Sequence, residues 1–165
     1  MADGDELESL PLLEDPFVLA VARGHALAAR APRRVGEDCL AGEKVILLEE
    51  GHCLRSQALQ VCARVGARSP ASIQATSLAT LVQMVAGGLG VTLLPSLALR
   101  VELQRDPALV ALAFRPPAPS RTLGLVWRRS STRGAEMALL GRELVHPFRA
   151  RAPKGPAVAA PRALA

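Results

Sequence analysis

The chain has 165 residues, of which 50% are hydrophobic and 21% are charged, so its length and composition suit one globular domain with a sizeable core. The formal net charge is +5, but the tail from residue 151 onward holds three basic and no acidic side chains, which leaves residues 1–150 with 17 basic and 15 acidic ones. This near balance argues against a nucleic-acid-binding domain, and no apolar run approaches the roughly 20 residues that span a membrane.

The first third of the chain predicts short elements. Residues 1–9 are polar, and we expect them to be disordered. Residues 10–22 contain two apolar runs separated by Glu14, Asp15 and Pro16. Because proline cannot donate to a ladder of hydrogen bonds, Pro16 argues against one central strand, and two short extended segments are expected. A loop with one turn of helix, a helical turn and a buried strand follow, at residues 23–34, 36–40 and 45–48.

Two helices are predicted in the middle of the chain. The first runs from Cys53 to Val65 and ends at Gly66, and the second runs to Ala86 after a cap at residue 76 or 77. The alternation of strands with helices implies an α/β fold with a mostly parallel sheet. We expect the tail, 149–165, to be disordered because it is rich in Ala, Pro and Arg. Further strands are predicted at 71–75, 91–95, 108–114 and 121–129, and further helices at 96–104 and 134–145.

The predicted helix at 53–65 carries two of the three cysteines, Cys53 and Cys62. Nine residues along a helix rise about 13.5 Å and rotate the chain by about 900°, so the two thiols lie on opposite faces. A disulfide requires Cα atoms within about 7 Å of each other. The two cysteines therefore cannot be joined unless this helix unwinds, and an oxidation of the pair would be coupled to a change of shape.

The two faces of this helix differ in polarity. Cys62 is expected to be buried and Cys53 exposed, at the helix N-terminus. At that position the helix dipole, together with His52 and Arg55 nearby, favours the thiolate form of Cys53. Peroxide oxidises a thiolate to a sulfenic acid, and the sulfenic acid then condenses with a second thiol to form a disulfide. Cys62 shares an apolar stripe with Leu54, Ala58, Val61 and Val65, and Cys53 shares a polar stripe with Gln57, Gln60 and Arg64.

Other interpretations of the cysteines stay open at this point. A cysteine on a helix is often a small packed hydrophobe, which is the expectation for Cys39 and, taken alone, for Cys62. For Cys53, packing and reactivity are equally open. A zinc site is disfavoured because His52, Cys53 and Cys62 cannot converge on one ion from this helix. A nucleophile of the Cys-His type would need a base, and nothing in the pattern places either of the other two histidines beside it.

Four segments together resemble the regulatory domain of LysR-type transcriptional regulators. The segment ATSLATLVQMVAGGLGVTLLP is typical of that family in general. The motif GHCLR with a second cysteine nine residues after its own is similar to the OxyR branch, which senses hydrogen peroxide. The segments are LPLLEDPFVLAVARGHALA, LAGEKVILLEEGHCLRSQALQVC, ATSLATLVQMVAGGLGVTLLP and PPAPSRTLGLVWRRSS.

This resemblance implies a type-2 periplasmic-binding-protein-like α/β domain over residues 10–148. One subdomain, at about residues 23–110, is expected to be nearly complete and the other partial. Nothing in the printed sequence resembles the N-terminal helix-turn-helix of the family. We therefore expect contact with promoter DNA and RNA polymerase only through a DNA-binding domain that is missing here.

The resemblance also implies roles for individual residues. Cys53 matches the peroxide-reactive cysteine and Cys62 its resolving partner, while His52 and Arg55 match residues that support the reactive thiol. Ser56 stands where family members commonly have aspartate. In the family, disulfide formation refolds this region and changes the packing of a homotetramer, which activates antioxidant genes. Hydrogen peroxide is thus the expected small-molecule partner, and no cofactor or metal is expected.

Three alternatives to this function remain. The domain could instead bind a small-molecule effector in the cleft between its subdomains, with incidental cysteines; it could be a non-functional truncated fragment; or it could be a thiol peroxidase. A regulator rather than an enzyme is the primary expectation. The N-terminus is acidic and lacks the basic and apolar regions of a signal peptide, and three cysteines are too few for a disulfide framework, so a cytoplasmic protein is expected.

Overall fold

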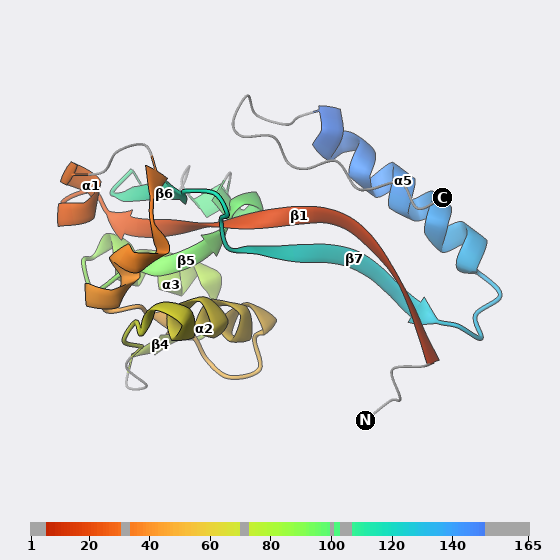
Figure 1. Ribbon diagram of the computed structural model, residues 1–165, viewed down its shortest axis with the longest axis horizontal. Helices are drawn as coiled ribbons and strands as arrows, with labels where there is room; N and C mark the ends of the chain where they lie inside the picture. Colours follow the sequence, from red (N-terminus) through yellow and green to blue (C-terminus); the bar gives the residue numbers. More distant parts are fainter. Residues whose placement is uncertain (1–5, 31–33, 70–72, 100, 103–106, 151–165) are drawn as a thin grey trace. The chain divides into compact units, whose positions relative to one another are not determined.

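The computed structural model describes residues 6–30, 34–69, 73–99, 101–102 and 107–150. The chain forms two compact units. The central unit is Pro16–Ser120, and the terminal unit combines Met1–Asp15 with Arg121–Ala165. One strand, β1 (Leu7–Ala22), contributes residues to both units (Figure 1).

The main sheet is mixed, and the prediction of a mostly parallel sheet was wrong for it. In the central unit β1 lies in the middle and pairs antiparallel with a neighbour on each side, so that Leu19 lies opposite both Leu93 and Leu112 (Figure 1). β1 thus runs opposite to β5 and β6, whereas β2 and β6 pair in parallel. The strand order is β2 (Arg34–Val35), β6 (Leu109–Phe114), β1 and β5 (Thr92–Pro95).

The prediction of two short segments at residues 10–22 was also wrong, since β1 is one strand of 16 residues. It begins at Leu7, within the segment that we expected to be disordered. Pro16 is accommodated because it lies where the strand passes from one unit to the other. The paired register of β1 with β5 starts at Phe17, whose N–H donates to the carbonyl oxygen of Pro119 at 2.8 Å.

The two helices predicted in the middle of the chain, at 53–65 and up to Ala86, are confirmed. α2 (Cys53–Val65) ends at Gly66, whose φ of 65° lies in the left-handed region that glycine adopts without strain. α3 (Leu78–Ala86) is capped by Ser77, whose side-chain oxygen accepts a hydrogen bond from the backbone N–H of Thr80 at 3.1 Å. Shorter helical segments are α1 (Ala26–Arg30) and the 3-10 helices η2 (Glu37–Gly42) and η3 (Ser96–Ala98).

A second, two-stranded parallel sheet lies beside these helices. It consists of β3 (Leu47–Leu48) and β4 (Gln74–Ala75). An isolated parallel bridge between Val45 and Val91 connects the segment before β3 to the segment before β5.

Alternate residues of β5 belong to different core clusters. Leu93 belongs to the large cluster that contains Cys62, whereas Leu94 packs with Val82 and Val85 of α3. This alternation follows from the strand geometry, in which successive side chains point to opposite faces. Both leucines are almost completely buried, with exposed fractions of 1% and 0%.

The terminal unit contains the first part of β1, all of β7 (Ser120–Arg128) except its first residue, and α5 (Gly134–Ala150). β7 pairs with β1, and Asp15 forms an ion pair of 2.9 Å with Arg121. α5 was predicted to end at residue 145, but it continues through Pro147 to Ala150. Across the described residues, no helix is long and apolar enough to cross a membrane.

Candidate functional site

The first residue of α2 is Cys53, and its side chain is exposed. The chain enters the helix through Gly51, whose φ of 92° requires a residue without a Cβ. His52 occupies the N-cap position with an extended backbone, and its side chain makes no capping hydrogen bond. The N–H groups of the first turn therefore have no side-chain acceptor from His52, and a helix N-terminus of this kind favours a nearby anion.

Cys62 lies near the other end of α2 and is buried, with an exposed fraction of 2%. Its side chain belongs to the large core cluster, together with Ala58 and Val61 of the same helix. Burial raises the pKa of the Cys62 thiol, because a thiolate loses its hydration in an apolar core. Cys62 is therefore held as a neutral thiol.

The two thiols are free and cannot approach each other in this conformation. α2 is continuous from Cys53 to Val65, so the separation of nine positions from Cys53 to Cys62 corresponds to a rise of about 13.5 Å. That rise is about twice the Cα separation that a disulfide tolerates. The predicted polarity of the helix is also confirmed: Cys53 is exposed, and Cys62 is buried.

Arg55 has a backbone partner. Its Nη1 donates a hydrogen bond of 2.8 Å to the carbonyl oxygen of Leu48, the last residue of β3. The guanidinium thus joins the first turn of α2 to the end of a strand, and the sequence did not predict this bond. Support of the Cys53 thiol by Arg55 and His52 stays a prediction.

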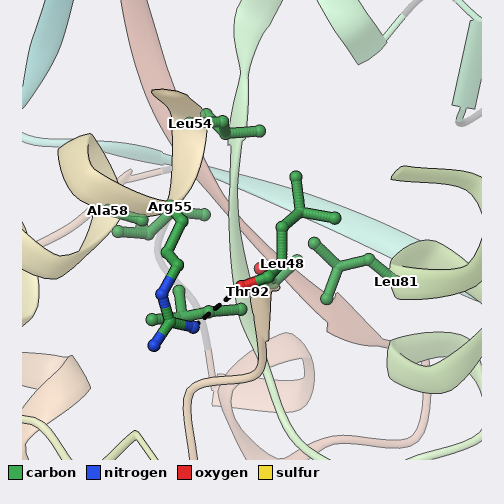
Figure 2. Close-up of a pocket in the computed structure, with 8 residues that line it drawn as sticks. Leu48, Leu54, Arg55, Ala58, Leu81 and Thr92 are labelled. Atoms are coloured by element: carbon green, nitrogen blue, oxygen red, sulfur yellow. Dashed lines mark hydrogen bonds between the residues drawn. The ribbon is translucent and has the colours of Figure 1, made fainter. Parts of the chain in front are cut away.

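A small cavity lies beneath the first turns of α2 (Figure 2). Figure 2 shows Leu54, Arg55 and Ala58 extending from α2, and Leu81 reaching the same space from α3. The hydroxyl of Thr92, another lining residue, donates a hydrogen bond of 2.8 Å to the carbonyl oxygen of Ile46. The other lining residues are Leu47, Leu48 and Leu93.

Two further features of α2 were not predicted. Arg64 forms an ion pair of 3.0 Å with Glu37 of η2, and its Nε and Nη2 atoms both donate to that carboxylate. The Oε1 atom of Gln57, one turn after Cys53, is buried without a hydrogen-bond partner among the described residues. The polar stripe of the helix includes both residues, but a sequence pattern does not indicate which side chains meet a distant segment.

The third cysteine, Cys39, lies in η2 and packs against the large core cluster. Burial, and to a lesser extent the negative charges of Asp38 and Glu43, raises the pKa of its thiol to about 11. Cys39 is consequently protonated at neutral pH. Within the described ranges, no group of three or more His, Cys, Asp or Glu side chains is arranged to hold a metal ion.

Comparison with known proteins places this fold in a family. Residues 2–148 match the family model of the LysR substrate binding domain. A probable hydrogen peroxide-inducible genes activator of Mycobacterium avium is 49% identical over 126 residues, which are 76% of this chain and 40% of the relative. The DNA-binding transcriptional dual regulator OxyR of Escherichia coli (strain K12) is 46% identical over 122 residues, 74% of this chain and 39% of the relative. The chain thus spans about 40% of the length of these curated relatives.

Solved structures of OxyR proteins have the same fold. A mutant OxyR of Corynebacterium glutamicum with bound H2O2 has a TM-score of 0.78 and 31% identity, covering 88% of this chain and 46% of that one. The reduced form of OxyR has a TM-score of 0.73 and 36% identity, covering 90% of this chain and 68% of that one. The predicted periplasmic-binding-protein-like α/β fold is confirmed by these similarities. The chain belongs to the family of LysR substrate-binding domains.

Proposed function

We propose that this domain is the peroxide-sensing part of an OxyR-like transcriptional activator, with Cys53 as the reactive cysteine and Cys62 as the resolving one. The observation that carries the proposal is the position of the two thiols on one helix, the first exposed at its N-terminus and the second buried near its end. The names of the relatives, which are hydrogen peroxide-inducible genes activators, supply the oxidant and the readout.

The first chemical step takes place at Cys53. Its thiolate sulfur attacks one oxygen of hydrogen peroxide, the O–O bond breaks, and the hydroxide that leaves takes up a proton to become water. The sulfur is oxidised to a sulfenic acid, and the peroxide is reduced. The helix N-terminus favours the thiolate that starts this step, and His52 and Arg55 are proposed to support it.

The second step joins the two cysteines. The Cys62 sulfur attacks the sulfenic sulfur of Cys53, the S–O bond breaks, and the hydroxide leaves with the proton of the Cys62 thiol as water. Because an intact α2 holds the thiols about 13.5 Å apart along its axis, the helix has to unwind for this bond to form. Formation of the disulfide would therefore change the conformation of this region.

The readout would involve partners outside this chain. The relative from Escherichia coli is named a DNA-binding transcriptional regulator. We therefore propose that promoter DNA and RNA polymerase are engaged through a DNA-binding domain and that the conformational change alters the packing of a homotetramer in the cytoplasm. By itself the chain is expected not to bind a promoter, since residues 1–150 carry nearly balanced charge. Sequence-selective, salt-sensitive retention of DNA by this chain would contradict that expectation.

Mass spectrometry after peroxide treatment tests the redox chemistry directly. Trypsin separates the three cysteines into different peptides, because it cleaves after Arg34, Lys44, Arg55 and Arg64. Peroxide is expected to link the peptides 45–55 and 56–64, with a loss of two hydrogens. Cys39→Ser should leave this link unchanged, and Cys53→Ser should abolish it.

Cys62→Ser provides the matched variant for the first step. It should leave Cys53 as a sulfenic acid that dimedone traps, because no thiol resolves it. Over-oxidised Cys53 without any linked peptide in the unsubstituted chain, or no reaction at all, would rule out the proposed switch.

A further inference from the structure

The terminal unit buries little apolar surface of its own. Among the side chains that the structure describes, the buried hydrophobic ones all belong to the central unit. A two-stranded ribbon is marginally stable at best, and the helix that covers this one leaves its hydrophobic side chains incompletely buried, so pairing with a further strand would stabilise the unit. Its exposed large hydrophobic residues are Leu7, Val126, Leu139, Leu140 and Leu144.

α5 covers one face of the ribbon that β1 and β7 form. A Cβ added at Gly141 of α5 would lie 2.7 Å from the side chain of Leu10 and 3.7 Å from that of Leu125, so helix and ribbon are in close contact there. Along β7, partly buried and exposed residues alternate strictly, as expected for a strand with one covered face. Val126 lies on the uncovered face and has an exposed fraction of 63%.

The outer edge of β7 is open. Figure 1 shows β7 beside β1, and none of the other described strands pairs with it. The N–H of Arg129 donates to the carbonyl oxygen of Glu6, just before β1, at 2.8 Å. Because the bonding groups of a strand alternate between its two edges, the N–H and C=O groups of the even-numbered residues, Gly124 and Val126 among them, point away from β1. Such a row of unpaired groups is a template for another strand.

The two edges of the ribbon differ in how well they resist pairing. In the terminal unit β1 contains Pro11, which has no N–H to donate, and two copies of it centred on Pro11 would place Glu8 opposite Glu14 of the second copy. The edge of β7 has neither safeguard, since residues 122–127 contain no proline and no charged side chain. Arg121 at its start is already neutralised by Asp15. The β7 edge is therefore the one that is suited to self-association.

We propose that β7 pairs with β7 of a second copy of this chain, antiparallel about a two-fold axis at Val126. The two ribbons then form one four-stranded sheet in a closed dimer. In this register Val126 faces Val126 of the second copy, Leu125 faces Trp127, and Gly124 leaves room for Arg128, so that no like charges lie opposite each other. The dimer does not depend on the redox roles of the cysteines.

Val126→Lys and Val126→Glu test the two-fold axis. Each variant places two like charges opposite each other in the dimer, so each should raise the dissociation constant of the dimer at least about tenfold. An equal mixture of the two variants should associate again, because Lys then faces Glu across the axis. Val101→Lys is the matched control: Val101 is also exposed, at 49%, but belongs to the central unit, and its substitution should leave the dimer unchanged.

Sedimentation equilibrium in the presence of a reductant measures the association without any disulfide between copies. The unsubstituted chain should reach twice the 17.4 kDa of one chain. A monomer at all concentrations would overturn the proposal and leave the edge of β7 to a different polypeptide. Equal weakening by Val126→Lys and Val101→Lys, or a mixture that does not associate, would overturn it as well.

Hydrogen–deuterium exchange of the unsubstituted chain gives a second measurement that does not depend on the folding of a variant. The amides of Gly124 and Val126 should become more protected as the protein concentration rises through the dissociation constant, because their N–H groups then bond to the second copy. Protection that is independent of concentration would contradict the proposed pairing. Neither result bears on the chemistry of Cys53 and Cys62, so the proposed function is tested separately.

Discussion

The guanidinium of Arg55 donates a hydrogen bond of 2.8 Å to the carbonyl oxygen of Leu48, which joins the first turn of α2 to the end of β3. The strand end is itself held to the neighbouring strand, since the N–H of Glu49 donates to the carbonyl oxygen of Ala75 at 3.0 Å. The start of the helix that carries Cys53 is therefore connected through one side chain to the sheet beneath it.

Loss of this hydrogen bond should loosen the start of α2. Arg55→Met keeps the apolar stem that lines the cavity and removes the donor, which leaves the Leu48 carbonyl without its partner. We expect the free energy of unfolding to fall by about 1–2 kcal/mol, as measured by urea denaturation. The control is Arg64→Met, which removes an ion pair whose arginine is 53% exposed and should cost less than about 1 kcal/mol. Equal effects of the two variants would contradict this role for Arg55.

The buried ion pair of the terminal unit should be important for the stability of that unit. The side chain of Asp15 is fully buried, and its carboxylate lies 2.9 Å from the guanidinium of Arg121. Arg121→Met leaves this carboxylate without the cation, so we expect a loss of about 3 kcal/mol. The single tryptophan, Trp127, lies in β7 of the same unit, and its fluorescence reports the unfolding in urea. Arg133→Met removes an exposed pair with Glu136 and should change stability by less than about 1 kcal/mol; a similar loss in both variants would refute the prediction.

Gly90 should tolerate no side chain. A Cβ at this position would lie 2.4 Å from the carbonyl oxygen of Lys44 and 3.0 Å from a side-chain carbon of Ile46. Gly90→Ala therefore has to displace the backbone that pairs the segments before β3 and β5, and we expect a loss of more than about 2 kcal/mol in urea denaturation. Gly42→Ala is the matched control, because nothing lies within 4 Å of its added Cβ. Its effect should stay within about 0.5 kcal/mol.

The stability of the reduced protein should fall at alkaline pH. Burial, with a smaller contribution from Asp38 and Glu43, raises the pKa of Cys39 from 9.0 to about 11, and burial also raises the pKa of Cys62. A thiol whose pKa is higher in the folded state keeps its full contribution to stability below the unfolded pKa, and this contribution is lost as the pH rises through the folded pKa. The decline should therefore begin near pH 9 and continue to about pH 11.

Cys39→Ala isolates the contribution of one thiol. Urea denaturation under reducing conditions at about pH 8 and about pH 10.5 should show a smaller loss of stability in this variant than in the unsubstituted chain. An identical loss in both proteins would show that Cys39 does not titrate in this range upon unfolding.

Local sequence patterns determined much of the central unit. The bounds of α2 and its end at Gly66 follow from periodicity and a glycine, and the start of α3 follows from a capping serine. The same periodicity predicted that Cys53 is exposed and Cys62 is buried, because the separation of two residues along a helix determines which face each side chain occupies.

Structural features that depend on partners far away in the sequence could not be predicted from local patterns. Pro16 and Pro147 both indicated an end of an element, yet β1 and α5 continue through them. A proline removes one donor, and whether that donor is needed depends on the strand or turn that faces it, which the local sequence does not contain. The antiparallel pairing of β1 was missed for a related reason, because its partners β5 and β6 lie far from it in the sequence.

The sequence by itself determined the helix, the two cysteines on its opposite faces, and the requirement that they cannot meet while the helix is intact. Only the tertiary structure decided what holds that helix in place: the bond from Arg55 to Leu48 and the ion pair of Arg64 with Glu37. The physical reason is that spacing along a helix is set by the local geometry of the backbone, whereas contacts and voids are set by side chains from segments that only the complete fold brings together.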